Sequence, residues 1–153
     1  MKRTLNPRFL VIFLSTTLIF LTSCGKESSA PAVQSNGSMA VLTVSDSPLY
    51  DFGLHDINVP TDKTLYVSNI GAGEATQITG SFFLSLSFSF KDGAYPGTGA
   101  TCTDYLSSLS MCTVVVTFTP KFTGVTETAV AISYFNGTKT VTTSMPTLHG
   151  QGN

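Results

Sequence analysis

Three cysteines have the most specific chemistry in this 153-residue sequence: Cys24, Cys102 and Cys112. A cysteine sulfur can be alkylated, joined to a second sulfur or bound to a metal ion, and its compartment and neighbours decide among these outcomes. Cys24 directly follows an apolar segment, whereas Cys102 and Cys112 lie ten positions apart in the second half of the chain. The first is therefore a candidate for modification, and the other two are candidates for a pair.

Cys102 and Cys112 are the two thiols that remain if Cys24 is modified, and in an exported protein such a pair is expected to form a disulfide. A loop of about ten residues closed in this way contributes roughly 3 kcal/mol in the loop-entropy model. The alternative is a metal site, but a zinc site needs four ligands. The only histidines, His55 and His149, stand far off without metal-ligand spacing. We predict the disulfide and no metal.

The N-terminal segment has the pattern of an export signal. Lys2, Arg3 and Arg8 accompany an apolar run over residues 9–21. A membrane-spanning helix needs ~20 apolar residues, whereas ~7–15 is typical of the apolar part of a signal peptide. Residues 1–23 are therefore predicted to form a signal peptide helix that is removed. An uncleaved anchor helix with an incidental cysteine is the alternative.

The tetrapeptide Leu21-Thr22-Ser23-Cys24 closes the apolar run and resembles the lipobox of bacterial lipoproteins. This resemblance implies a diacylglycerol on the Cys24 sulfur, usually with an N-acyl chain, and two or more chains give stable membrane anchoring. Gly25 in place of aspartate favours the outer membrane, by analogy with enterobacterial sorting. The expected location is the bacterial cell envelope, lipid-anchored, on the periplasmic face or the cell surface.

Residues 24–38 are small and polar, which predicts a lipidated N-terminus followed by a flexible linker. Removing the signal takes away three basic residues and leaves five against nine acidic ones, a net charge of −4. No cluster of Lys or Arg follows Lys26. Nucleic acid is therefore excluded as an expected partner.

Alternating apolar and polar residues from position 39 onward predict β-strands, because successive strand side chains point to opposite faces. Phe82 to Phe90 alternates most clearly, and its even positions Phe82, Leu84, Leu86, Phe88 and Phe90 are predicted to face inward. The segment is long enough to bend or break in the middle. Residues 112–118 alternate as well. The residues predicted to face inward from this and two further strands are Cys112, Val114, Val116, Phe118, Leu65, Val67, Val130, Ile132 and Tyr134.

Turn signals separate these segments and predict the architecture. Asn136-Gly137 predicts a hairpin turn, followed by a last strand from Val141 toward Leu148. One short helical turn is expected between Tyr105 and Met111. Strands separated by turn signals every 8–12 residues or so indicate a sandwich. The sequence thus predicts one all-β domain over residues 39–153.

Several short motifs follow one another in this region: Asp51-Phe52-Gly53, Asn69-Ile70-Gly71, Tyr95-Pro96-Gly97, Phe118-Thr119-Pro120 and Leu148-His149-Gly150. Their order resembles that of the choice-of-anchor D repeats of bacterial surface and periplasmic proteins. Those repeats are relatives of the ASH domains of Hydin-like proteins and of the major sperm protein group. The resemblance implies an immunoglobulin-like β-sandwich of about seven strands, used for binding or as a spacer, without catalytic residues.

Other constellations give weak signals. Gly93 to Gly99 is glycine-rich but lacks the Gly-Lys-Ser/Thr of a phosphate-binding loop, so a loop packed beside the disulfide is expected. Asp46, Asp51, Asp56 and Asp62 lack the spacing of a calcium loop and are expected to be solvated turn residues. No Gly-x-Ser-x-Gly motif is present.

The sequence therefore favours a membrane-anchored, non-catalytic binding or scaffolding module over an enzyme, which is the least expected class. A surface adhesin or carbohydrate-binding module is the alternative. The expected partners are the membrane, through Cys24, and another envelope protein or a surface polymer. No cofactor is expected, and the ligand-binding residues are not identified.

Overall fold

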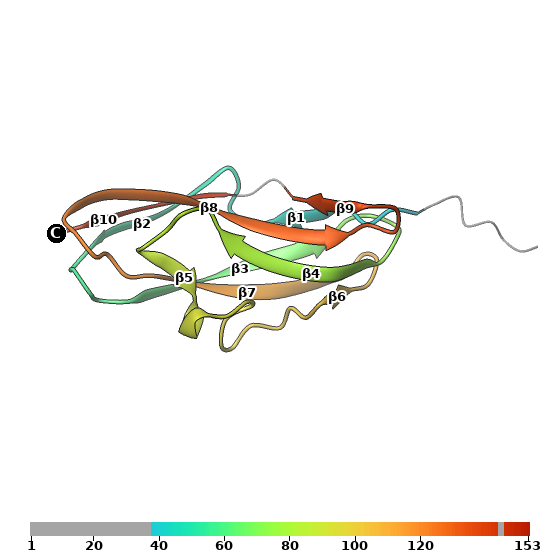
Figure 1. Cartoon of the computed structure of the whole chain (residues 1–153), viewed down its shortest axis with the longest axis horizontal. Coiled ribbons are helices and arrows are strands. Elements are labelled where there is room, and N and C mark those ends of the chain that lie inside the picture. The colour runs from blue at the N-terminus through green and yellow to red at the C-terminus, as the bar shows by residue number, and fades with distance from the viewer. Residues whose placement is uncertain (1–37, 144–145) are drawn as a thin grey trace, which may run out of the picture. The chain divides into compact units, whose positions relative to one another are not determined.

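Two β-sheets packed face to face make up the described part of the chain, residues 38–143 and 146–153 of a computed structural model (Figure 1). The signal segment, Cys24 and most of the linker lie outside these residues. The strands are β1 (Leu42–Val44), β2 (Leu49–His55), β3 (Thr61–Asn69), β4 (Ala75–Phe82), β5 (Phe88–Phe90), β6 (Tyr105–Leu106), β7 (Met111–Phe118), β8 (Gly124–Phe135), β9 (Thr140–Thr142) and β10 (Thr147–Gly152).

The first sheet has the strand order β1-β3-β7-β5, and the second has the order β2-β10-β8-β4-β6. β9 also pairs with β8, and all pairings are antiparallel except that of β10 with β2. The long strand β8 binds β10 along its first half and β4 along its second half. This arrangement is an all-β immunoglobulin-like sandwich, as the sequence predicts. It contains ten strands rather than about seven, because four of them have only two or three residues.

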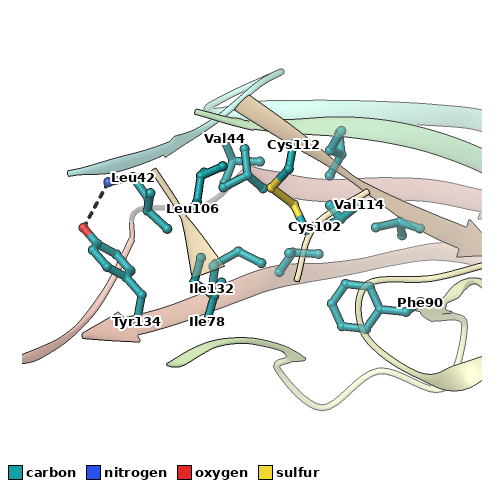
Figure 2. Packing of buried hydrophobic residues seen from close by; sticks show 14 of the residues in the cluster. Leu42, Val44, Ile78, Phe90, Cys102, Leu106, Cys112, Val114, Ile132 and Tyr134 are labelled. Carbon is teal, nitrogen blue, oxygen red and sulfur yellow. Dashed lines mark hydrogen bonds between the residues drawn. A yellow bond between two sulfur atoms is a disulfide. The ribbon is translucent and has the colours of Figure 1, made fainter. Parts of the chain in front are cut away.

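The hydrophobic core lies between the sheets, where the predicted inward residues meet (Figure 2). On β7 the predicted inward residues are confirmed, since Cys112, Val114, Val116 and Phe118 are all in the buried core, while Val115 and Thr117 of the other face are covered as well. Phe118 stacks on Phe88 with ring centroids 4.6 Å apart. The predicted inward residues of β3 and β8 are buried as well. Phenylalanine and β-branched residues thus supply the apolar area that stabilises the two sheets.

The segment from Phe82 to Phe90 is not one continuous strand. β4 ends at Phe82, and β5 begins only at Phe88. Leu84 has a positive φ of 42°, which breaks the extended backbone. Leu84 and Leu86, predicted to face inward, are exposed. The seryl oxygen of Ser85 accepts hydrogen bonds from the backbone N–H groups of Ser87 and Phe88, so a local turn replaces the middle of the predicted strand.

Two other local predictions were wrong. Tyr105 and Leu106 form the short strand β6 paired with β4, and no helical turn follows them before β7. The predicted last strand is two strands: β9 continues the Asn136-Gly137 hairpin, whereas β10 pairs with the other half of β8 and with β2. In the described residues, no helix has the length and apolar character needed to cross a bilayer.

Candidate binding surface

Cys102 and Cys112 are joined by a disulfide with their Cα atoms 4.9 Å apart, in agreement with the predicted pairing. Both cysteines are buried in the core (Figure 2). The backbone N–H of Cys102 also donates to the carbonyl oxygen of Thr113 at 3.0 Å. The bridge therefore fixes the end of the loop that follows β5 onto the free edge of β7.

The glycine-rich loop runs along β7, as expected of a loop beside the disulfide. The N–H of Val115 donates to the carbonyl of Pro96 at 2.9 Å. Gly97 has a φ of 95°, and a Cβ at this position would lie 2.4 Å from the carbonyl oxygen of Val115. Glycine is thus required here for close backbone approach. The loop extends the first sheet rather than presenting a row of N–H groups to a phosphate.

The loop between β4 and β5 exposes three large apolar side chains. Phe83, Leu84 and Leu86 are 73%, 90% and 80% exposed, and together they are called the β4–β5 surface below. Its first residue is held in place, because the N–H of Phe83 donates to the carbonyl of Ala129 at 3.1 Å. The hydroxyl of Thr128 in turn donates to the carbonyl of Phe83 at 2.7 Å. The apolar side chains therefore project from a backbone that is bonded to β8.

A hollow of about 480 Å³ adjoins this surface. Its aromatic lining comes from Phe82, Phe88, Phe90 and Tyr95, and the other lining residues are Leu84, three serines and two glycines. The ring of Tyr95 packs edge-on against Phe90, with centroids 5.3 Å apart. A Cβ at Gly80 would lie 2.4 Å from the Tyr95 ring, so this glycine makes room for the ring. The hollow is wide enough to receive an apolar side chain of a partner.

The hydroxyl of Tyr95 is the one buried side-chain polar atom of the described residues without a hydrogen-bond partner. Burial raises the pKa of Tyr95 to about 12, because the phenolate is harder to solvate there than in water. An unpaired buried hydroxyl costs free energy of folding. The Tyr95 hydroxyl therefore lowers the stability of the folded domain.

A second hollow, of about 280 Å³, contains an ion pair between Lys91 and Asp62. The Lys91 ammonium lies 2.8 Å from one oxygen of Asp62, and the Thr117 hydroxyl donates to the other at 2.6 Å. The hydrogen bond from Lys91, followed by that from Thr117, lowers the pKa of Asp62. The same carboxylate raises the pKa of Lys91. Both oxygens of the Asp62 carboxylate therefore have a hydrogen-bond donor. The group joins β3, which contains Asp62, to Thr117 of β7 and to Lys91, directly after β5.

The four predicted surface aspartates do not converge on one site. Asp46 accepts from Ser45 and pairs with Lys63, while Asp51 accepts from the backbone N–H of Gly53 and pairs with His149 at 2.8 Å. The hydrogen bond from His149, more than that from Gly53, lowers the pKa of Asp51. Within residues 38–143 and 146–153, no group of three or more His, Cys, Asp or Glu side chains is placed to hold a metal.

The buried amide of Asn69 joins three segments at the end of the sandwich where the described chain begins. Its oxygen accepts from the N–H groups of Val41 and Gly71. Its nitrogen donates to the carbonyls of Gly73, Leu106 and Ser107. The Asn69-Ile70-Gly71 motif was available in the sequence. Its role was missed because the partners of the amide lie up to 38 positions away.

No known protein-family profile matches the chain, and no curated protein matches it. Solved structures resemble its fold. The VesB protease of Vibrio cholerae aligns with a TM-score of 0.56 and 12% identity, over 72% of this chain and 31% of that one. The secreted serine protease VesC of the same organism aligns with a TM-score of 0.51 and 15% identity, over 72% and 23%.

The ASH/PapD-like domain of human CEP192 (PapD-like domain 7) also aligns, with a TM-score of 0.46 and 15% identity, over 73% of this chain and 84% of that domain. The chain spans less than a third of each Vibrio cholerae protease that it matches. At such identities a likeness describes the fold and not the activity. The two protease matches therefore support the β-sandwich fold alone.

Proposed function

We propose that this protein is a lipid-anchored, non-catalytic binding module of the bacterial cell envelope. Its immunoglobulin-like domain binds another envelope protein through the β4–β5 surface. The observation that carries the proposal is the exposure of Phe83, Leu84 and Leu86 on one loop beside a hollow lined by aromatic rings and serines. Exposed apolar patches of this kind on a folded domain mark interaction sites.

The geometry of the β4–β5 surface suits protein recognition. Energetically important contacts at interfaces are large apolar or aromatic side chains that enter well-packed pockets. Leu84 and Leu86 can enter a pocket of the partner, while the hollow walled by Phe82, Phe90 and Tyr95 can receive a side chain from it. The first residue of the loop, Phe83, is bonded to β8, and its second end is held by the Ser85 hydroxyl, which reduces the ordering cost of binding.

Two sequence features support the envelope location. Residues 1–23 have the pattern of a signal peptide, and Leu21-Thr22-Ser23-Cys24 resembles a lipobox. The disulfide between Cys102 and Cys112 is typical of proteins that fold in an oxidising compartment. Anchoring is tested with Cys24→Ser, which should abolish incorporation of labelled fatty acid and leave the precursor uncleaved. Incorporation at the wild-type level would contradict the anchor.

Binding is tested by affinity capture of the tagged full chain from solubilised envelope membranes. The double variant Leu84→Ser/Leu86→Ser removes two exposed side chains without touching the core. Co-purification of the partner should fall about tenfold or more, since truncation of central apolar contacts weakens interfaces by ~2 kcal/mol or more. The matched control is Leu54→Ser/Val125→Ser, whose side chains are exposed on the second sheet and flank Gln151 of β10.

Equal loss in both double variants would show that general surface hydrophobicity, and not the β4–β5 surface, retains the partner. Unchanged capture by Leu84→Ser/Leu86→Ser would contradict the proposed site. Capture of a polysaccharide in place of a protein would favour the alternative of an adhesin or carbohydrate-binding module. Each variant is first shown to be folded by a cooperative urea unfolding transition like that of the unsubstituted chain.

A further inference from the structure

A second group of exposed apolar side chains lies at the end of the sandwich that contains Asn69. Its members come from the first residues of the domain, from the turn after β3 and from the turn before β7, and all are at least 45% exposed. They are called the tether-end patch below: Met39, Val41, Ile70, Leu109 and Met111.

Three of these side chains lie just beyond the strand ends, where backbone bonds bring the segments together. The N–H of Ile70 donates to the carbonyl of Val41 at 2.9 Å, which continues the pairing of β1 with β3. The ladder of β3 with β7 ends at the pair Ser68–Met111, and Ile70 and Leu109 line one hollow beyond it. Val41, Ile70 and Leu109 therefore gather at one end of the first sheet.

The backbone beneath this patch is fixed. The Asn69 amide bonds Val41, Gly71 and Gly73 as well as the turn after Leu106. The hydroxyl of Ser108 donates to the carbonyl of Gly71 at 2.8 Å. Gly71 itself has no room for a side chain, since a Cβ would lie 2.3 Å from the carbonyl oxygen of Met39. The patch is thus a preformed surface.

The chemistry of the patch is neutral. Ile70, Leu109 and Met111 line a hollow of about 310 Å³, and the remaining residues that line it are Ser68, Asn69 and Ser110. A surface that attracts anionic headgroups or acidic proteins would carry Lys or Arg. Apolar side chains bordered by hydroxyl groups instead suit the boundary between lipid headgroups and acyl chains.

The tether-end patch lies where the predicted linker joins the domain, so a lipid anchor at the start of that linker would keep the patch near the membrane. Cys24 and the linker precede Ser38, and Met39 is itself part of the patch. A linker of about fourteen residues with random-coil statistics spans roughly 20 Å. If Cys24 carries lipid, the tether-end patch is held within about that distance of the bilayer, so its effective concentration at the membrane is high.

We propose that the tether-end patch inserts into the interfacial region of the bilayer to which Cys24 anchors the chain. This inference rests on the proposed lipid anchor. It also orients the domain. Ala40 is bonded to Asn136 at one end of β8, and Phe83 is bonded to Thr128 eight residues earlier, which corresponds to roughly 27 Å along the strand. The β4–β5 surface is thereby kept away from the lipid and available to a protein partner.

The chain contains no tryptophan, so a single introduced tryptophan reports its own surroundings. The test uses the full, processed chain reconstituted into phosphatidylcholine vesicles with or without brominated acyl chains. Leu109→Trp places the reporter in the patch, and Leu84→Trp is the matched control on the β4–β5 surface. The two positions are comparable, since Leu109 is 81% exposed with φ 55° and Leu84 is 90% exposed with φ 42°.

Brominated lipid should quench Leu109→Trp at least about twofold more than Leu84→Trp. Bromine quenches only a tryptophan close to it, and an interfacial apolar face lies ~5–10 Å into the region where headgroups meet acyl chains. Met111→Trp, in the regular strand β7, should behave like Leu109→Trp and covers the case in which the turn does not tolerate tryptophan. The result should persist when anionic lipid is added or salt is raised, since the patch is neutral.

Equal quenching at positions 84 and 109, or quenching at neither, would overturn the membrane contact while vesicle flotation still supports the anchor. Protein that fails to float with vesicles and lacks the mass of attached acyl chains would overturn the lipid anchor, and the membrane contact with it. Flotation and mass are measured on the same samples, so the two failures are distinguished.

Discussion

The side-chain oxygen of Asn69 accepts a hydrogen bond from the backbone N–H of Val41 at 3.2 Å, across 28 positions of sequence. Asn69→Ala should lower the free energy of unfolding by about 2–4 kcal/mol, because it leaves several buried backbone groups without partners. Urea unfolding measures the change. The control is Ser68→Ala, one residue earlier on the outer face of β3, which should change stability by less than about 0.5 kcal/mol. Similar losses in both would contradict the role assigned to the amide.

Tyr95→Phe should raise stability by about 1 kcal/mol, because it removes a buried hydroxyl that has no partner. The pKa of Tyr95 is raised to about 12 in the folded state from an ordinary value of 10.0. The unfolded chain therefore loses its proton first, and folding stability should fall as the pH rises from the ordinary value toward the raised one. Unfolding measured at several pH values should show a smaller alkaline loss for Tyr95→Phe. A destabilised variant would mean that the hydroxyl has a water partner.

Reduction of the Cys102–Cys112 disulfide should lower stability by about 2–3 kcal/mol, since the bridge closes a short loop. The melting temperature should drop by roughly 10 °C for a domain of this size, and the sandwich should stay folded on its own core. Calorimetry with and without reductant measures the difference, and Cys102→Ala/Cys112→Ala should be insensitive to reductant. Complete unfolding at 25 °C on reduction would show that the core is insufficient alone.

Asp62 should contribute to stability at neutral pH and lose that contribution in acid. Its pKa is lowered in the folded state by the hydrogen bonds from Lys91 and Thr117. The contribution is therefore complete above the unfolded pKa, ~4, and disappears as the pH falls through the lower folded value. Asp62→Asn should flatten the fall in stability between about pH 5 and pH 2. Lys91→Met should flatten it as well, because it removes the main cause, and an unchanged slope in both variants would contradict this account.

The sequence was sufficient for the parts of the fold that depend on local alternation. β7 could be predicted because Cys112, Val114, Val116 and Phe118 face a core that covers the whole strand. The same alternation from Phe82 to Phe90 wrongly placed Leu84 and Leu86 on a buried strand face. There, the hydroxyl of Ser85 bonds the backbone locally and Leu84 takes a positive φ, so the period of two continues in the sequence but not in space.

The surfaces depend on contacts that a single sequence does not show. The tether-end patch exists because residues near positions 40, 70 and 110 meet through the Asn69 amide. The β4–β5 surface exists because Phe83 is fixed to β8, about 45 positions later. Contacts between residues so far apart in the chain leave no periodic pattern in the sequence. Cys102 and Cys112 were the exception, because the chemistry of a thiol pair in an exported chain limits the possible partners.

Strand β1 has a mechanical consequence. Any tension applied to the chain before Ser38 enters the domain at β1, which is an edge strand of only three residues paired antiparallel with β3. Two side chains from outside the first sheet reinforce it. The Tyr134 hydroxyl accepts from the N–H of Leu42 (Figure 2), and the Thr143 hydroxyl donates to the carbonyl of the same residue. A pull along β1 loads these bonds and the ladder to β3 together, in shear. The force needed to open the domain from this end therefore depends on the hydrogen bonds that hold Leu42 and its short strand.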